Sequence, residues 1–402
     1  MVDKKRNILL ISYFFAPSTI VGAKRFSYLS SYLDNSEFRV HILTINEKYI
    51  NQKDTSIPFN GIIHKTSAYP VVTVGKSIFA KFKKRLLLIL LPLDLFSGWI
   101  PHAIIQGMKI LRKEKFQKIL VSAPPFSSFL IGYILSKIFK VDLILDYRDP
   151  WFIDLGPSVI FKKAVFGIEK KILKGATNIV FNTNKARELY LESGFGPYVV
   201  KKSYVINNAY LNNHDIEPVY LEKNKKVILY AGNLYHERRL GYLFKPLLKL
   251  IDNSFLDRLS FAIHVFGRIP AEDYSLAEEL NLQNNIFRHD HISHDEIKRY
   301  MKGADILYLP QSVLGKYSIA YKFFDYLSVR KPILAITSKD SAIAEIMQEI
   351  DCGEVADYSD EDSVYNSLLK LINKNHKYEF NNIENYSWES AAKKYSKIIA
   401  TD

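Results

Sequence analysis

The sequence contains a single cysteine, Cys352, among its 402 residues. One thiol forms neither an intramolecular disulfide nor a cysteine-based zinc site, and its scarcity fits a reducing compartment. Long apolar runs are also missing. The longest uncharged one, Leu86–Leu93, is far shorter than the roughly 20 residues of a membrane-spanning helix. The basic N-terminal segment lacks the small-residue cleavage site of a signal peptide, so we expect a cytoplasmic protein.

Acidic residues are scarce in the first half of the chain. The formal net charge is +13, and residues 1–200 contain 29 Lys and Arg against 14 Asp and Glu, whereas residues 201–402 contain 26 against 28. A one-sided basic surface attracts polyanions such as an anionic membrane leaflet, a phosphorylated substrate or nucleic acid. The alternative is that the lysines only keep the chain soluble.

Short apolar runs alternate with helical stretches along the chain. Such a pattern is typical of parallel sheets covered on both faces. The predicted strands are Asn7–Ser12, Arg39–Thr44, Ile119–Ser122, Leu143–Asp146, Asn178–Asn182, Tyr204–Asn207, Val227–Ala231, Phe261–Phe266, Ile286–Arg288, Ile306–Leu309 and Ile333–Ile336. The predicted helices include Phe26–Leu33, Phe129–Phe139, Asp295–Met301 and Tyr321–Ser328. Because the polar stretch Asn212–Lys226 interrupts the series, we predict two α/β domains with a ligand crevice at their strand ends.

Two segments of the first half carry candidate binding residues. The loop Phe14–Arg25 has Gly22 near its middle and leads into a helix, where backbone N–H groups attract anions; an ordinary turn is the alternative. It fits neither the dinucleotide fingerprint nor the P-loop. In Leu145–Trp151, LDYRDPW, the charges of Asp146, Arg148 and Asp149 follow a buried strand, where they are costly unless they pair or touch a ligand. A structural Arg–Asp pair is the alternative.

The second half offers a glycine followed by two arginines. The segment YAGN places Gly232 and Asn233 after a predicted strand, with Arg238 and Arg239 a few residues on. Glycine lets a diphosphate approach the backbone, and arginine neutralises its oxygens. The alternative is a surface helix with two solvated arginines.

A predicted helix start lies in the stretch Pro310–Leu334. The helix begins close to Ile319, so that its N-terminus and Lys322 favour a phosphate. Asp325, three residues after Lys322, lies on nearly the same face and could accept hydrogen bonds from sugar hydroxyls. An ordinary Lys–Asp pair is the alternative.

These segments, taken in order, resemble a known family. The matching stretches are YFFAPSTIVGAKR, GWIPHA, SAPPFSS, LDYRDPW, YAGN, ADILYLP, KFFDYLSVRKPILAI and YSWESAAKKYSKII. Together they resemble the family 4 glycosyltransferases of the GT-B fold, of the bacterial surface-polysaccharide type, over nearly the whole chain.

The resemblance implies an α/β fold of two Rossmann-like domains whose parallel sheets face each other across a cleft. Residues 1–211 would bind the acceptor, residues 212–385 would bind the donor, and a helix at 386–402 would return to the first domain.

The implied activity is transfer of a sugar from a nucleoside diphosphate sugar to a saccharide or a polyprenyl-diphosphate-linked acceptor. This reaction would serve O-antigen, capsule or exopolysaccharide (including lipopolysaccharide) synthesis, with retention of anomeric configuration and without a metal or other cofactor. Two alternatives stay open: a nucleotide-sugar epimerase or hydrolase on the same fold, and a degenerate polyanion-binding protein. Since no nucleic-acid module is recognisable, nucleic acid is not an expected partner.

The resemblance also assigns residues. The donor site would comprise Gly22, Gly232, Asn233, Arg238, Arg239, Tyr317, Ser318, Ile319, Lys322 and Asp325. Arg238 and Lys322 would stabilise the leaving diphosphate, and Asp149 is the candidate for a protein base. The family's E-x7-E pattern falls on Tyr317 and Asp325, so its first Glu is replaced by Tyr317 here.

A basic, apolar segment in the first half suggests a membrane surface. In Lys76–Phe96, the residues Lys81, Lys83, Lys84 and Arg85 precede a strongly apolar run. Such a segment can lie in the interface of an anionic leaflet, and Arg148 would also belong to this acceptor side. We therefore expect peripheral association with the inner face of the cytoplasmic membrane. A buried helix with a basic flank is the alternative.

Overall fold

The computed structural model describes residues 5–33, 37–69, 93–153, 162–212, 216–312, 315–373 and 377–401. The chain divides into two compact units. The N-terminal unit comprises residues 1–208 and 388–402, and the C-terminal unit comprises residues 209–387. Helix α14 (Trp388–Ala400), in the segment expected to return to the first domain, belongs to the N-terminal unit. The predicted membrane segment with Lys81, Lys83, Lys84 and Arg85 lies outside the described residues.

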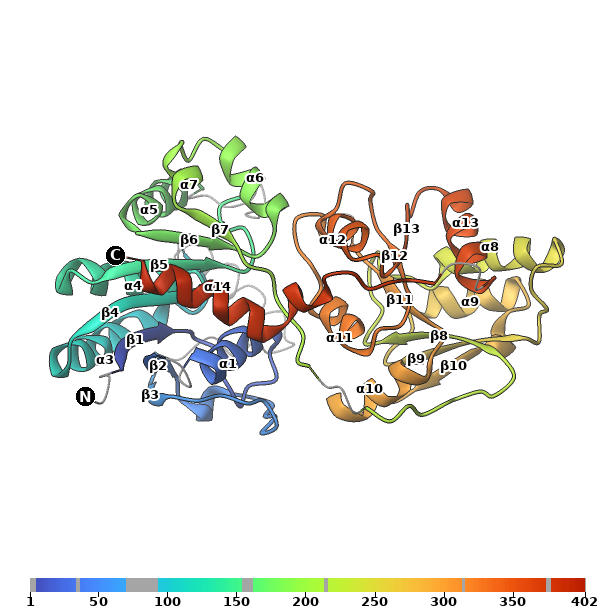
Figure 1. Ribbon diagram of the computed structural model, residues 1–402, viewed down its shortest axis with the longest axis horizontal. Helices are drawn as coiled ribbons and strands as arrows, with labels where there is room; N and C mark the ends of the chain where they lie inside the picture. Colours follow the sequence, from blue (N-terminus) through green and yellow to red (C-terminus); the bar gives the residue numbers. More distant parts are fainter. Residues whose placement is uncertain are drawn as a thin grey trace, which may run out of the picture. The chain divides into compact units, whose positions relative to one another are not determined.

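The N-terminal unit is built on a parallel seven-stranded sheet in the order β3-β2-β1-β4-β5-β6-β7 (Figure 1). Its strands are β1 Arg6–Ile11, β2 Phe38–Ile45, β3 Ile62–Thr66, β4 Phe116–Ala123, β5 Asp142–Tyr147, β6 Asn178–Phe181 and β7 Ser203–Val205. Its helices are α1 Val21–Leu33, α3 Ile100–Lys113, α4 Ser127–Phe139, α5 Lys162–Gly175, α6 Asn184–Glu192, α7 Tyr198–Lys201 and α14.

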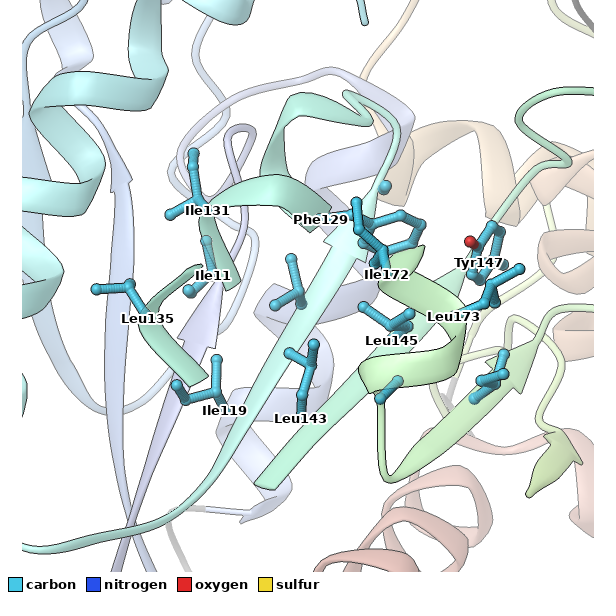
Figure 2. Packing of buried hydrophobic residues seen from close by; sticks show 14 of the residues in the cluster. Ile11, Ile119, Phe129, Ile131, Leu135, Leu143, Leu145, Tyr147, Ile172 and Leu173 are labelled. Carbon is cyan, nitrogen blue, oxygen red and sulfur yellow. The ribbon is translucent and has the colours of Figure 1, made fainter. Parts of the chain in front are cut away.

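Alternate strand residues build the core of this unit. Ile11, Ile119 and Leu145 pack with residues of α4 and α5, such as Leu135 and Ile172 (Figure 2). The residues between them along the strands are equally buried, so both faces of the sheet are covered. Two-residue periodicity with both faces apolar accounts for the continuous hydrophobic runs in the sequence.

The C-terminal unit repeats this architecture with a parallel six-stranded sheet in the order β10-β9-β8-β11-β12-β13. Its strands are β8 Lys226–Ala231, β9 Phe261–Phe266, β10 Ile286–His289, β11 Ile306–Pro310, β12 Ile333–Ile336 and β13 Gly353–Ala356. Its helices are α8 Gly241–Asp252, α9 Ala271–Glu279, α10 His294–Gly303, α11 Tyr321–Val329, α12 Ala342–Ile350 and α13 Glu361–Ile372. Short 3-10 turns at Glu47–Tyr49, Ser97–Trp99, Gln283–Asn285 and Ile383–Tyr386 complete the described elements.

Alternation along β8 again divides the apolar residues between two layers. Ile228 packs with α8, α9 and α13, whereas its neighbour Leu229 packs with α10, α11 and α12. Helices therefore cover both faces of this sheet as well, as the sequence pattern predicts.

The predicted start of the first helix, Phe26, is wrong by several residues, whereas the predicted helix Tyr321–Ser328 begins where α11 does. Helix α1 begins at Val21, so Gly22 lies in its first turn and not in the middle of a loop. Ala23 N–H donates to the Ile20 carbonyl at 2.8 Å, which starts the helix before the apolar periodicity becomes visible. Helix α11 begins at Tyr321, two residues after Ile319. Ile319 is instead buried in the core beneath the helix start.

No helix in the described part of the chain combines the length and the apolar character required to span a bilayer.

Candidate functional site

The carboxyl end of β8 brings Gly232 against Lys322 of α11. Gly232 has a φ of +128°, and a Cβ atom built on it would lie 2.7 Å from Lys322 Nζ. The lysine donates to Tyr230 Oη at 2.7 Å and to the Ala231 carbonyl at 2.9 Å. A side chain at position 232 would therefore displace the ammonium group, and glycine is required by both the backbone conformation and the space.

Lys322 is a cation held in an environment that disfavours its charge. Burial, followed by the nearby charge of Arg238, lowers the pKa of Lys322 to about 7, while Asp325 opposes this effect. The ammonium group also lies 4.0 Å from the centroid of the Tyr230 ring, which is fully buried. An anion placed here would restore the favourable charge balance, so the site is suited to a phosphate.

The two predicted arginines have different surroundings. Arg238 donates to Tyr235 Oη at 2.5 Å and lies over the Tyr235 ring, on a partly exposed segment. Arg239 Nε donates to Asp273 at 2.9 Å, and the buried Asp273 also accepts the N–H group of Leu240. Arg239 thus forms an ion pair with Asp273 near the start of α8, whereas the charge of Arg238 lowers the pKa of Lys322.

The segment before α11 is ordered by Gln311. Its Nε2 donates to the carbonyls of Gly315 and Ser318, at 3.0 and 2.9 Å. Tyr317, between these two residues, lies beneath the ammonium of Lys316, which is 5.2 Å from its ring centroid. The predicted residues 317–319 therefore form the entry to α11, and Lys322 follows within its first turn.

Asp325 and Asn233 each have a histidine partner that the sequence did not suggest. Asp325 Oδ1 lies 3.0 Å from His294 Nε2, at the start of α10. Asn233 Oδ1 lies 3.0 Å from His291 Nε2 and accepts the Arg268 N–H group at 3.0 Å. The loop after β10 therefore orients two of the predicted donor-site residues.

In the N-terminal unit, the predicted residues Gly22, Arg148 and Asp149 come together where β5 ends. A Cβ atom on Gly22 would lie 1.9 Å from Arg148 Nη1, so a larger residue at this position would displace the guanidinium. Arg148 is largely buried and donates to the Pro124 carbonyl. Asp149 keeps an exposed surface, but the surrounding protein desolvates its carboxylate, which raises its pKa more than the charge of Arg148 lowers it. A carboxylate of raised pKa is a stronger base.

Asp146 has a different role from its neighbours in LDYRDPW. It lies inside β5, fully buried, and accepts from Arg25 Nη2 at 2.8 Å. Burial acts to lower the pKa of Arg25, but Asp146 and Tyr395 overcome this and raise it. Tyr395 Oη accepts from Arg25 at 2.7 Å and donates to Asp146 at 2.8 Å. This buried network, which joins α1, β5 and α14, was missed because its members are 121 to 370 residues apart.

A second missed group supports the segment that carries Asp149. Glu169 of α5 is completely buried and accepts the Phe152 N–H group at 3.1 Å and Tyr190 Oη at 2.6 Å. Burial raises the pKa of Glu169 to about 7 despite these hydrogen bonds. Its role is to fix the backbone three residues beyond Asp149.

Among the described residues, no group of three or more His, Cys, Asp or Glu side chains is arranged to hold a metal ion.

Comparisons with known proteins agree with this architecture. Residues 225–374 match the family described as glycosyl transferases group 1, a match that covers much of the C-terminal unit. No curated protein matches the sequence.

Solved structures resemble the chain over nearly its full length. Sucrose-phosphate synthase from Thermosynechococcus elongatus is 13% identical with a TM-score of 0.66, covering 98% of both chains. Alr3699/HepE from Anabaena in complex with UDP is 12% identical with a TM-score of 0.65, covering 98% of this chain and 99% of its own. The lipopolysaccharide outer core galactosyltransferase WaaB is 12% identical with a TM-score of 0.61, at the same coverage. At these identities the likeness establishes the fold: a two-domain α/β fold of the GT-B type.

Proposed function

We propose that this protein is a glycosyltransferase that uses a nucleoside diphosphate sugar bound by its C-terminal unit. The observation that carries the proposal is the environment of Lys322. Its ammonium group is buried beside Gly232 at the end of β8, and the charge of Arg238 contributes to lowering its pKa. The match to glycosyl transferases group 1 covers this unit, and the structurally similar Anabaena protein binds UDP.

The chemistry of glycosyl transfer suits these residues. The bond between the sugar C1 and the diphosphate oxygen breaks while C1 bonds to the acceptor oxygen, so positive charge develops on the sugar ring and negative charge on the leaving diphosphate. Lys322 and Arg238 would stabilise that leaving group in place of a divalent metal. In a retaining route the leaving phosphate takes the acceptor proton. Where a protein base is used, Asp149 is our candidate.

The other predicted donor residues take supporting roles in this proposal. Asp325, oriented by His294, would accept hydrogen bonds from the ribose, and the entry to α11 would contact the diphosphate through Ser318 and Ile319. Gly22 would approach the diphosphate from the N-terminal unit, as the family resemblance implies. Tyr317 replaces the acidic residue expected near the transferred sugar.

We further propose that the acceptor is a saccharide or a polyprenyl-diphosphate-linked saccharide of bacterial surface polysaccharide, met at the inner face of the cytoplasmic membrane. The basic N-terminal half supports this proposal. Replacing Lys81, Lys83, Lys84 and Arg85 by Gln is expected to abolish salt-sensitive sedimentation with anionic vesicles. Equal sedimentation of the variant and the wild type would refute docking through this segment.

The test of the activity is a product assay with UDP-, GDP- and dTDP-sugars, run with and without acceptor and with EDTA. We expect transfer that needs the acceptor and continues under chelation. Donor turnover at full rate without acceptor would indicate an epimerase or hydrolase instead. Loss of transfer with EDTA, and its recovery on adding metal, would contradict the metal-independent route.

A further inference from the structure

One face of the N-terminal unit has an unusual charge composition. Helices α4, α5 and α7, with the residues that follow α4 and α7, carry nine lysines and no arginine. The lysines are Lys137, Lys140, Lys162, Lys163, Lys170, Lys171, Lys174, Lys201 and Lys202. The one acidic residue on these helices, Glu169, is completely buried and points into the core. Helix α5 contacts both α4 and α7 (Figure 1). Lys137 of α4 lies with Lys170, Lys171 and Lys174 of α5 around one depression.

Four of these lysines line a cavity of about 470 Å³, together with Tyr133, Gly167 and Gly175. We call it the lysine pocket. Its volume is in the range of small-molecule sites, and it is a shallow depression open to solvent. A Cβ on Gly175 would lie 2.4 Å from the Tyr133 ring, so this ring packs directly on the glycine, whereas a Cβ on Gly167 would meet no atom within 4 Å. Gly167 therefore leaves one side of the pocket open.

The lysine pocket lies apart from the candidate residues Arg148 and Asp149, which follow the carboxyl end of β5. Lys137 and Lys174 lie in the last turns of α4 and α5, which lead into the starts of β5 and β6. Arg148 and Asp149 follow the end of β5. The pocket thus lies towards the amino ends of these strands, at the opposite edge of the sheet from the candidate base, and its function does not depend on the proposed transferase activity.

The charges around the lysine pocket favour an anion, although the C-terminus of α5 lies nearby. The C-terminus of a helix carries partial negative charge, which would repel an anion near Lys174. Lys202 Nζ donates to the carbonyls of Lys174 and Ala176, at 3.1 and 2.6 Å, and so neutralises this end of α5. Burial, and after it the charge of Lys137, lower the pKa of Lys202, so these two lysines repel each other. A bound anion would relieve this repulsion.

We propose that the lysine pocket binds a phosphate group. Ammonium groups act as point charges for phosphate, whereas the absence of arginine from these helices removes the bidentate donors that read nucleic-acid bases. The phosphate could come from a soluble molecule such as pyrophosphate or from a phospholipid headgroup, and the two sources share this chemistry.

Two matched pairs of variants test the pocket by calorimetric titration with inorganic pyrophosphate. Gly167→Glu puts a carboxylate into open space at the pocket, and Gly167→Gln adds the same volume without charge. Lys170→Gln/Lys174→Gln removes two lining charges, and Lys109→Gln/Lys113→Gln removes two exposed charges from α3. All four variants keep the donor-site residues, so differences between the members of a pair report on the pocket alone.

If the phosphate is that of a soluble molecule, Gly167→Glu and Lys170→Gln/Lys174→Gln each bind pyrophosphate at least tenfold more weakly than their control variants. A tenfold loss corresponds to about 1.4 kcal/mol of binding free energy. If the phosphate is that of a headgroup, pyrophosphate binding is equal within each pair, but Gly167→Glu and Lys170→Gln/Lys174→Gln sediment less with phosphatidylglycerol vesicles than their controls do, with phosphatidylcholine vesicles as the neutral reference. Thermal unfolding at equal midpoints confirms that the variants fold. If the members of each pair agree in both assays, the proposal is wrong.

Discussion

At the scale of single residues, the candidate donor site depends on one lysine whose charge is costly. Lys322 is held between Tyr230 Oη and the Ala231 carbonyl, and its charge is disfavoured by burial and by Arg238. The sequence selects Lys322 by its place at a helix start, but it does not indicate that the charge of this lysine is disfavoured. The structure does, because Gly232 leaves just enough room for its ammonium group.

The lowered pKa of Lys322 gives nucleoside diphosphate binding a defined pH dependence. Below about pH 7 the ammonium is already formed, whereas above it binding must take up a proton. We expect the affinity to fall by up to tenfold per pH unit above about pH 7, as measured by titration between pH 6.5 and 9. The Lys322→Arg variant keeps its charge over this range and is expected to lose the alkaline decrease. A wild-type affinity that is constant from pH 7 to 9 would contradict the assignment.

The Asp325→Ala variant tests whether the same site also binds the ribose of the donor. Its carboxylate lies 3.0 Å from His294 Nε2. Asp325→Ala is expected to raise the donor KM roughly tenfold with little change in kcat, because about one hydrogen bond to the ribose is lost before and during reaction alike. Asp340, an exposed acid of the same unit, provides the control Asp340→Ala. An equal fall in kcat and kcat/KM would place Asp325 at the reacting centre instead.

At the scale of elements, the sheets were predictable and several connections were not. The apolar runs predicted eleven strands because both faces of each sheet are buried. Edge strands β3 and β13 escaped detection, since neither forms a continuous apolar run: β3 contains His64 and Lys65, and β13 begins Gly353-Glu354. The first turn of α1 was missed because Val21 and Gly22 carry no helical periodicity.

The position of α14 depends on a buried polar contact as well as on apolar packing. Tyr395→Phe removes the hydroxyl that bridges Arg25 and Asp146. We expect a loss of about 1–3 kcal/mol in the free energy of unfolding, because two buried charged groups each lose a hydrogen-bond partner. Urea-induced unfolding measures this change, and Tyr204→Phe, at an exposed position on β7, serves as the control. Equal stabilities of the two variants would show that the network is replaced by other contacts.

At the scale of the whole molecule, the sequence predicted two α/β units and the candidate site residues. It did not predict the side chains to which those residues are hydrogen-bonded. Gly232, Arg238 and Lys322 could be selected because each follows a strand or begins a helix. Lys322, Arg239 and Asp325 interact with Tyr230, Asp273 and His294, respectively, and ordinary strand and helix patterns do not single out these three partners. Long-range contacts of this kind carry no local signal, so the chemistry of the site emerges only once the chain is folded.

The central claim is that the C-terminal unit binds a nucleoside diphosphate through Lys322 and Arg238. Calorimetric titration of UDP, GDP and dTDP into the wild type and the two single alanine variants tests it most directly. With the nucleotide that binds the wild type, Lys322→Ala and Arg238→Ala are each expected to weaken binding by about 1.5–3 kcal/mol, the scale of a charge-assisted hydrogen bond. Lys245→Ala, at an exposed position on α8, is expected to bind as the wild type does. Unchanged affinity in both Lys322→Ala and Arg238→Ala would place the donor site elsewhere.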